Sequence, residues 1–541
     1  MKELVSKTRA RQTLKREKRS TQMASRKRHW KDRPSVRLLP VFSLWAVTLA
    51  ILHFEAMLGL SPAPQSFPVM AGNAVFLMAG LFATGLFLKI VRPRLLDNPG
   101  SVLLLTAIAL LSIVSAKLLL YTGDTLPGFP PDVAAFSLPF VLAPMLAATL
   151  LSAPAAVAVG GWSGLAMSMA ASPERRFAIF ATAVAVAIVV ALFSRGIRKR
   201  AQALKIGFLA GSFGVLCLLA LTTLNWPHAD PSIHGFLAQI LACLASGFVC
   251  AVATLLLLPL FEALFNITSD ISLLELSDLG HPLLQRLALE APGSYHHSLV
   301  AALLAQAAAD EIGANSLLAR TAMYFHDIGK LTKPDFFTEN IMHKSNPHDD
   351  IPPSMSALVI IAHVKEGISL ALLHKLPESI RRILREHHGT SLISYFHYKA
   401  KSQLELGLEG KENGNGKSYV NENDFRYPGP KPSSRESALV CLADAVEAAS
   451  RSMEKTTPAN IEGLVNDIVA MRIEDGQLDE SDLTLSEIAK IKRSFVFSLA
   501  NMLHGRTPYP KDETRDKPSA KPAAAKPDKD PGPASATGPT P

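Results

Sequence analysis

The chain has 541 residues, too many for one compact core, so two large units with flanking tails are the first expectation. Hydrophobic residues make up 48% of the chain and charged residues 19%, and the long apolar runs lie before residue 266, whereas charge and histidine concentrate after it. A membrane half is therefore expected to precede a soluble half. Three of the four cysteines lie inside apolar segments and Cys441 lies in a helical pattern, so neither a disulfide framework nor a CxxC zinc site is implied.

Residues 1–38 form a basic tail that carries much of the formal net charge of +9. Positive charge beside the first apolar stretch holds that end of a chain in the cytoplasm. Binding to a DNA or RNA duplex is not expected, because this basic run abuts a membrane segment. A secretory signal is not expected either, since the apolar stretch is long and begins late.

Residues 39–265 are predicted to be a transmembrane domain of about eight helices, because a span needs about 20 mainly apolar residues. The predicted spans cover roughly residues 39–60, 71–91, 101–121, 132–151, 153–171, 176–194, 205–224 and 235–260. Loops containing RPR and SRGIRKR then lie inside and GDTLPGFPPD lies outside, so both termini are predicted to be cytoplasmic. The loop SPERR is an exception, because it places arginines on the outer side.

Residues 266–508 change to the pattern of amphipathic helices, and we expect a helical bundle there. Apolar residues follow helical spacing in 298–311, 316–329, 355–375, 377–388 and 434–453. The predicted fold class is therefore all-α, with a multi-span transmembrane bundle followed by a cytosolic helical bundle. The polar stretch from residue 401 to residue 424 is predicted to be a surface excursion, and residues 509–541 a disordered tail.

Histidines and aspartates recur on successive helices of the soluble half. Each one alone is more often a core histidine or a capping carboxylate than a metal ligand. Together they supply imidazole and carboxylate donors, which suit iron or manganese better than the thiolates of structural zinc sites do. The predicted metal ligands are His297, His326, Asp327, His363, His387, His388 and Asp444, and the spacing leaves His296 open as an alternative to His297.

The adjacent residues His326 and Asp327 can serve two metal ions, because the two oxygens of one carboxylate can bridge them. His387 and His388 precede Gly389, a natural helix end at which both imidazoles can reach one ion. Two ions about 3.5–4 Å apart generate a hydroxide and stabilise both the attacking and the leaving oxygen of an in-line displacement. This chemistry suits hydrolysis of a phosphodiester.

Asp327 and Lys330 are the predicted catalytic residues. Lys330 lies four residues after His326, so on a helix its ammonium group would face the same pocket. There it could bind the substrate by neutralising phosphate charge.

The chain resembles the seven-transmembrane-receptor HD-hydrolase family, the membrane-bound cyclic di-AMP phosphodiesterases of bacteria. The resemblance runs through much of residues 72–508 and is carried by EAPGSYHHSLV, TAMYFHDIGKL, NPHDDIPPSMSALVIIAHVKEG, REHHGTSLISYFHYKA, DFRYPGPKPSSRESALVCLADAVEAA and DGQLDESDLTLSEI. It favours His297 over His296. It implies one ion held by His297, His326 and Asp444, a second held by His363, His387 and His388, and Asp327 between them.

The resemblance also implies the reaction, which is hydrolysis of cyclic di-AMP to pApA with two divalent ions, iron or manganese, at the bacterial inner membrane. The hydrolase domain would lie in the cytoplasm. Expected partners are the cyclic dinucleotide and the lipid bilayer, and a homodimer is left open. The family usually has a sizeable extracytoplasmic domain between its first two spans, where this chain has only LSPAPQSFPVMAG.

Two alternatives are weighed against this function. The first is a cyclic di-GMP phosphodiesterase, but such enzymes typically continue their paired histidines as HHE, whereas this chain has HHGTSL. The second is a catalytically silent nucleotide-binding membrane receptor. That alternative predicts the loss of at least one metal ligand, and none is missing.

Overall fold

The computed structural model describes residues 34–54, 67–126, 129–194, 196–224, 232–341, 345–405, 411–412, 418–453 and 456–504. Regular structure in these segments is helical except for one antiparallel pair of two-residue strands, β1 (Lys411–Glu412) and β2 (Ser418–Tyr419). The predicted all-α class is confirmed. The strands lie within the predicted surface excursion, and the tail at 509–541 and most of the basic tail lie outside the described residues.

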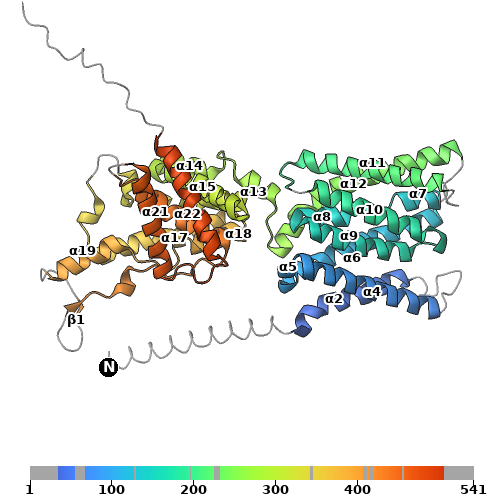
Figure 1. The fold of residues 1–541 in the computed structure, drawn as a ribbon, viewed down its shortest axis with the longest axis horizontal. Coiled ribbons are helices and arrows are strands. Elements are labelled where there is room, and N and C mark those ends of the chain that lie inside the picture. The colour runs from blue at the N-terminus through green and yellow to red at the C-terminus, as the bar shows by residue number, and fades with distance from the viewer. Residues whose placement is uncertain are drawn as a thin grey trace, which may run out of the picture.

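The first group of helices lies at one end of the long axis of the molecule (Figure 1). It contains α2 (Pro34–Leu52), α4 (Phe67–Val91), α5 (Pro93–Asp97), α6 (Pro99–Thr125), α7 (Pro131–Phe136), α8 (Leu142–Leu150), α9 (Ala153–Ala170), α10 (Arg176–Phe193), α11 (Arg200–Thr223) and α12 (Ile233–Phe265). By length and apolar composition, α4, α6, α10, α11 and α12 can each cross a membrane. The chain is therefore a membrane protein.

The predicted span over residues 132–151 is wrong as one continuous helix. α7 ends at Phe136 and α8 begins at Leu142, and Pro139 in the break has no N–H group with which to continue a helix. The hydroxyl of Ser246 in α12 donates a hydrogen bond of 2.7 Å to the Leu138 carbonyl oxygen within the break. Because most residues of α8 are buried, the broken segment packs inside the bundle.

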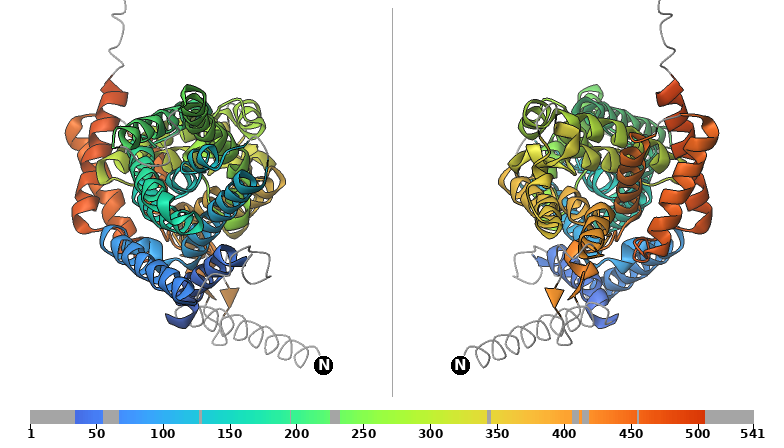
Figure 2. Two further views of the ribbon diagram at one scale, coloured as in Figure 1. Left: turned by 90° about the vertical axis from the view of Figure 1, so that its right-hand side faces the viewer. Right: turned by 90° about the vertical axis from the view of Figure 1, so that its left-hand side faces the viewer.

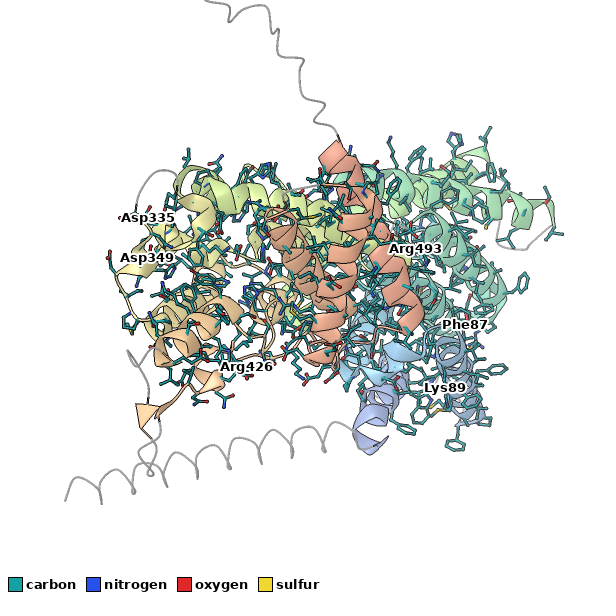
Figure 3. The ribbon with its side chains drawn as sticks, turned by 60° about the vertical axis from the view of Figure 1, so that its left-hand side comes forward. Phe87, Lys89, Asp335, Asp349, Arg426 and Arg493 are labelled. Carbon is teal, nitrogen blue, oxygen red and sulfur yellow. The ribbon has the colours of Figure 1, made fainter. Side chains whose placement is uncertain are left out.

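In the first group of helices and its loops, Arg175 is paired with an opposite charge and Lys89 lies near a helix end. Arg175, in the loop that departs from the inside-positive pattern, forms an ion pair of 3.0 Å with Asp132. α2 and α4 lie along one edge of the bundle (Figure 1 and Figure 2), and Phe87 and Lys89 are exposed on α4 (Figure 3). Lys89 lies in the last turn of α4, where a long side chain can carry its charge to the membrane surface.

α11 and α12 approach each other through glycines. Gly207 and Gly211 are four residues apart in α11, and they face Gly247 of α12. A Cβ atom on Gly247 would meet the carbonyl oxygen of Gly207 and lie 2.8 Å from the Gly211 Cα atom. Small residues with this spacing allow two membrane helices to pack backbone against backbone.

The second group of helices lies at the other end of the molecule (Figure 1). It contains α14 (Pro282–Glu290), α15 (Pro292–Ile312), α16 (Ser316–Phe325), α17 (Pro353–Leu373), α18 (Glu378–Glu386), α19 (Ser394–Glu405), α20 (Arg435–Ser450), α21 (Pro458–Glu474) and α22 (Leu485–His504). α15 packs on α16, α20 and α22 through buried alanines, which let the helices approach closely. α17 is as long and apolar as a span, but it packs against the other helices of this group.

A short connection through α13 (Asp270–Leu276) joins the two groups. The Glu262 carboxylate near the end of α12 accepts hydrogen bonds from the Ser269 N–H at 2.7 Å and the Ser272 hydroxyl at 2.8 Å. Arg200 at the start of α11 forms an ion pair of 2.7 Å with Glu275 of α13. α13 in turn packs against α16, so contacts run from the membrane helices into the second group.

Substitution of Gly247 by valine tests the α11–α12 packing. The added side chain would force the two backbones apart, which should cost about 1–3 kcal/mol, as overpacking typically does. Thermal unfolding of the detergent-solubilised chain should therefore begin at a lower temperature. Gly161→Val is the control, because no atom lies within 4 Å of a Cβ built on Gly161. Equal thermal stability of the two variants would contradict the packing.

Candidate metal centre

The seven predicted ligands meet at one place, although five helices or helix ends carry them. His297 lies on α15, His326 and Asp327 follow α16, and His363 lies near the middle of α17. The others come from the end of α18 and from α20. They form two groups in which the ligand atoms all lie within 4.8 Å of one another: His297, His326 and Asp444, and Asp327, His363, His387 and His388.

Asp327 lies between the two groups, with one carboxylate oxygen toward each. Its Oδ2 atom is 3.3 Å from His326 Nε2 and 3.9 Å from His297 Nε2, whereas its Oδ1 atom is 3.5 Å from His363 Nε2. The groups also approach each other at Asp444, whose Oδ2 atom is 3.4 Å from His388 Nδ1. One carboxylate placed in this way can bind two ions.

Backbone carbonyls orient three of the imidazoles. His326, His363 and His387 each direct Nδ1 to the carbonyl oxygen of the third residue before it, at 2.8, 2.6 and 2.7 Å. A proton on Nδ1 leaves Nε2 free to bind a metal. Among the described residues, His326 Nε2 and Asp327 Oδ1 are buried without a hydrogen-bond partner, which is costly in a protein interior and fits atoms that bind a cation.

His297 is oriented by a carboxylate instead. Its Nδ1 atom bonds to Glu447, which also accepts a hydrogen bond of 2.8 Å from Arg451, and its Nε2 atom is 3.0 Å from Asp444 Oδ1. Glu447 was missed in the sequence, although it lies three residues after Asp444 on the same face of α20. His296 is exposed to solvent, so only His297 of this pair reaches the centre.

The electrostatic environment of Asp327, His387 and His388 favours the binding of a cation. Burial alone would raise the pKa of Asp327, but the charges of His326 and Lys330 hold that pKa well below its usual range. Burial lowers the pKa of His387 to about 3 and also lowers the pKa of His388. The carboxylate is therefore ionised and these imidazoles are neutral, which are the forms that bind metals.

His297 differs from these imidazoles in its protonation. Burial lowers its pKa, but the hydrogen bonds to Asp444 and Glu447 outweigh burial and raise the pKa to about 10. In the absence of a metal, His297 is therefore an imidazolium held between two carboxylates.

Lys330 lies in the predicted pocket but not on the predicted helix. The helix expected over 316–329 is too long, because α16 ends at Phe325 and Lys330 lies in the 3₁₀ turn η2 (Ile328–Thr332). The turn passes against the backbone of α17, where a Cβ atom on Gly329 would clash with the His363 carbonyl. The Lys330 ammonium lies 2.7 Å from Asp327 Oδ2 and 2.6 Å from Glu339 Oε1, so two carboxylates already neutralise it.

The turn that carries the paired histidines is held by residues that follow α21. Gly389 has a φ of 54°, which ends α18 as predicted. The side-chain oxygen of Gln477 accepts a hydrogen bond of 2.8 Å from the Thr390 N–H. Asp475 accepts two hydrogen bonds from Arg426, at 2.9 and 3.2 Å. These residues lie in segments that carry the family resemblance, but nothing in their spacing shows that they meet.

A cavity of about 670 Å³ opens beside the two groups, within the range typical of small-molecule sites. Tyr427, which sequence analysis also missed, lines it and stacks on the His388 ring with 4.2 Å between ring centroids. The lining includes ligand residues and a mixture of cationic and apolar side chains, such as Lys330, Arg472, Phe337 and Ile393. A large organic anion can therefore reach the centre.

Comparison with known proteins finds two family models along the chain. Residues 67–269 match the family model described as a 7TM receptor with intracellular HD hydrolase, and residues 294–449 match the HD domain. The chain therefore resembles a 7TM receptor with an intracellular HD hydrolase in both its membrane part and its helical domain. The predicted resemblance is thus confirmed, and the ligand groups described above lie in the HD domain, whose members depend on metal.

Two curated relatives are named cyclic-di-AMP phosphodiesterase PgpH. The protein from Bacillus subtilis is 43% identical over 265 residues, which cover 49% of this chain and 35% of the relative. The protein from Listeria monocytogenes is 36% identical over 325 residues, which cover 59% of this chain and 42% of the relative. The chain therefore spans about two fifths or less of the length of these relatives.

A solved structure is also similar. The crystal structure of the L. monocytogenes PgpH HD domain in complex with cyclic-di-AMP is 41% identical, with a TM-score of 0.38. The similarity covers 42% of this chain and 100% of that chain.

Removal of the His297 imidazole should weaken metal binding in the first group, because that group would keep only His326 and Asp444 beside the shared Asp327. We expect His297→Ala to bind manganese at least about 10-fold more weakly, since even residues that only support metal ligands cost 10- to 100-fold. His296→Ala is the matched control and should bind as the unmodified chain does. Metal analysis after dialysis measures both, and equal loss in the two variants would contradict the placement of His297.

Metal binding should release a proton from His297, because the ion must replace the proton on Nε2 of an imidazole whose pKa is raised to about 10. The affinity for manganese should therefore increase as pH rises from 7 to 8, by up to about tenfold for one proton. Calorimetric titration in two buffers with different ionisation enthalpies counts the released protons. Release of no proton at pH 7 would show that His297 is neutral before the metal binds.

Proposed function

We propose that this chain is a membrane-anchored, metal-dependent phosphodiesterase that hydrolyses cyclic di-AMP to pApA. The observation that carries the proposal is the placement of Asp327 between two groups of imidazole ligands, with one oxygen toward each. The names of the two PgpH relatives support cyclic di-AMP as the substrate.

In this proposal His297, His326 and Asp444 hold one ion, His363, His387 and His388 hold the other, and Asp327 is shared. The donors are all nitrogen and oxygen, which fits iron or manganese. Two such ions supply a more acidic water and offset negative charge on the phosphate.

The chain's own residues orient the centre and balance its charge. Hydrogen bonds at Nδ1 keep the imidazoles of His326, His363 and His387 pointed inward. His326 and Lys330 keep Asp327 ionised, and the Lys330 ammonium lines the cavity, where it can donate a hydrogen bond to a phosphate oxygen. We place Lys330 beside the phosphate that is cleaved.

The proposed domain organisation is a basic tail at 1–38, a transmembrane domain at 39–265, a hydrolase domain at 266–508 and a C-terminal tail at 509–541. We propose that both termini and the hydrolase domain lie in the cytoplasm, because loops rich in lysine and arginine favour that side of a membrane. Most of the short loop between the first two spans lies outside the described residues. Two copies are proposed to associate, which the mass of the detergent-solubilised chain would test.

The activity is tested with the full chain in detergent, loaded with manganese or with iron under reducing conditions. Cyclic di-AMP, cyclic di-GMP and pApA are separated by chromatography after incubation. We expect cyclic di-AMP to be converted to pApA. The rate should fall at least about 100-fold in Asp327→Asn, because that substitution removes a charge that both ions share and should exceed the 10- to 100-fold cost of losing a supporting residue.

Three outcomes would decide against parts of this proposal. Cleavage of cyclic di-GMP alone would overturn the substrate. Full activity of Asp327→Asn would overturn the shared role of Asp327. Absence of metal-dependent cleavage, with metal content confirmed, would favour a receptor that binds nucleotide without hydrolysing it.

A further inference from the structure

A cationic side chain that lines the cavity beside the metal centre has no ion pair within the part of the chain that the structure describes. Arg472 lies in the last turn of α21 and lines the same cavity as His297, His388 and Asp444. Its Nε atom is buried and has no hydrogen-bond partner in the part of the chain that the structure describes. A buried guanidinium donor without an acceptor is costly, so this site favours a ligand that supplies one.

Nearby carboxylates already have other partners. Asp475, three residues after Arg472, is held by Arg426 at 2.9 and 3.2 Å and by Gln477 at 2.8 Å. The two other lysine or arginine residues that line the cavity also have carboxylate partners, since Lys330 pairs with Asp327 and Glu339, and Arg451 pairs with Glu447. Burial alone would raise the pKa of Asp475, but the hydrogen bonds from Arg426 and Gln477 lower it, and the charge of Arg472 adds to that lowering. No carboxylate of the described residues forms an ion pair with Arg472, so its guanidinium group can still pair with a bound anion.

The positive charge of Arg472 affects the pKa values of two buried groups near the cavity, Cys441 and Tyr427. Burial raises the pKa of the Cys441 thiol on α20 to about 11, and the positive charge of Arg472 opposes that rise. Burial also raises the pKa of Tyr427, and Lys330 and Arg472 both oppose it. Arg472 is thus close to the cavity wall formed by Tyr427 and α20, and the apolar side chains of Ile468 and Met471 line the same cavity.

A cyclic dinucleotide has two phosphodiester groups on opposite sides of its ring. The two ions and Lys330 can act on only one of them at a time. The other keeps its negative charge and enters the cavity with the rest of the molecule. Guanidinium groups bind phosphate through two parallel hydrogen bonds, which makes arginine the suitable residue for a phosphate that is held and not cleaved.

We propose that Arg472 binds the phosphodiester group that is not hydrolysed, and that it thereby selects dinucleotides over diesters with a single phosphate. This inference rests on the proposed function and adds a second phosphate site to the same cavity. No bond is made or broken at Arg472, so its contribution is to binding and position.

The test compares cyclic di-AMP with bis(p-nitrophenyl) phosphate, a diester with one phosphate, on the full chain in detergent. Arg472→Met should raise the KM for cyclic di-AMP roughly 10- to 100-fold, as expected for loss of a charged hydrogen bond, with little change in kcat. The inhibition constant of bis(p-nitrophenyl) phosphate as a competitor should stay within about twofold, because that ligand does not need a second phosphate site. Arg472→Lys should give an intermediate KM.

Arg493→Met is the control for loss of an arginine elsewhere in the hydrolase domain, because Arg493 is exposed on α22 (Figure 3). Arg493→Met should change neither the KM for cyclic di-AMP nor the inhibition constant of bis(p-nitrophenyl) phosphate, and the metal content should be equal in all variants.

An unchanged KM for cyclic di-AMP in Arg472→Met would overturn the inference while leaving the phosphodiesterase activity in place. Equal weakening of both ligands would also overturn it, because Arg472 would then act on the metal centre. Failure of the unmodified chain to cleave cyclic di-AMP would instead overturn the proposed function, and the inference with it.

Discussion

The site depends on one buried carboxylate, Asp327, that faces imidazoles on both sides. An ionised carboxylate is costly to bury unless positive charge surrounds it, and here His326 and Lys330 compensate for that cost. The close contact of Gly329 with the backbone of α17 brings His363 within 3.5 Å of the same carboxylate. Five helices or helix ends must therefore meet around Asp327, and the small buried residues of α15 allow that approach.

The C-terminal ends of α16 and α18 orient two of the imidazoles at the candidate metal centre. The last carbonyl groups of a helix have no partner within it, so a histidine just beyond the end can donate its Nδ1–H to one of them. His326 does this after α16 and His387 does it after α18, and each ring then presents Nε2 to the centre. The histidines thus complete the helix termini and orient themselves by the same bond, which requires no additional residue.

Sequence patterns predicted most of the helices and the histidines and aspartates that meet at the candidate centre, because apolar periodicity and clusters of these residues are local features. The spacing alone did not choose between His296 and His297. They did not predict the end of α16 at Phe325, because the turn that follows depends on contact with α17. Gln477 lies 87 residues from its partner Thr390, and Ser246 lies 108 residues from Leu138, so neither contact leaves a local signal. Glu447 could have been found, since it follows Asp444 by one helical turn.

The proposed sharing of Asp327 by two ions would have a consequence for a cell in which metal is scarce. The two groups are chemically unequal, because one contains the carboxylate of Asp444 and two imidazoles, whereas the other contains Asp327 and three imidazoles. Their affinities would therefore differ, and the first ion bound would withdraw charge from the carboxylate that the second ion needs. The two metal sites would therefore fill one after the other as the metal concentration rises. Hydrolysis that needs both ions would begin only when the metal concentration is high enough to fill the weaker site.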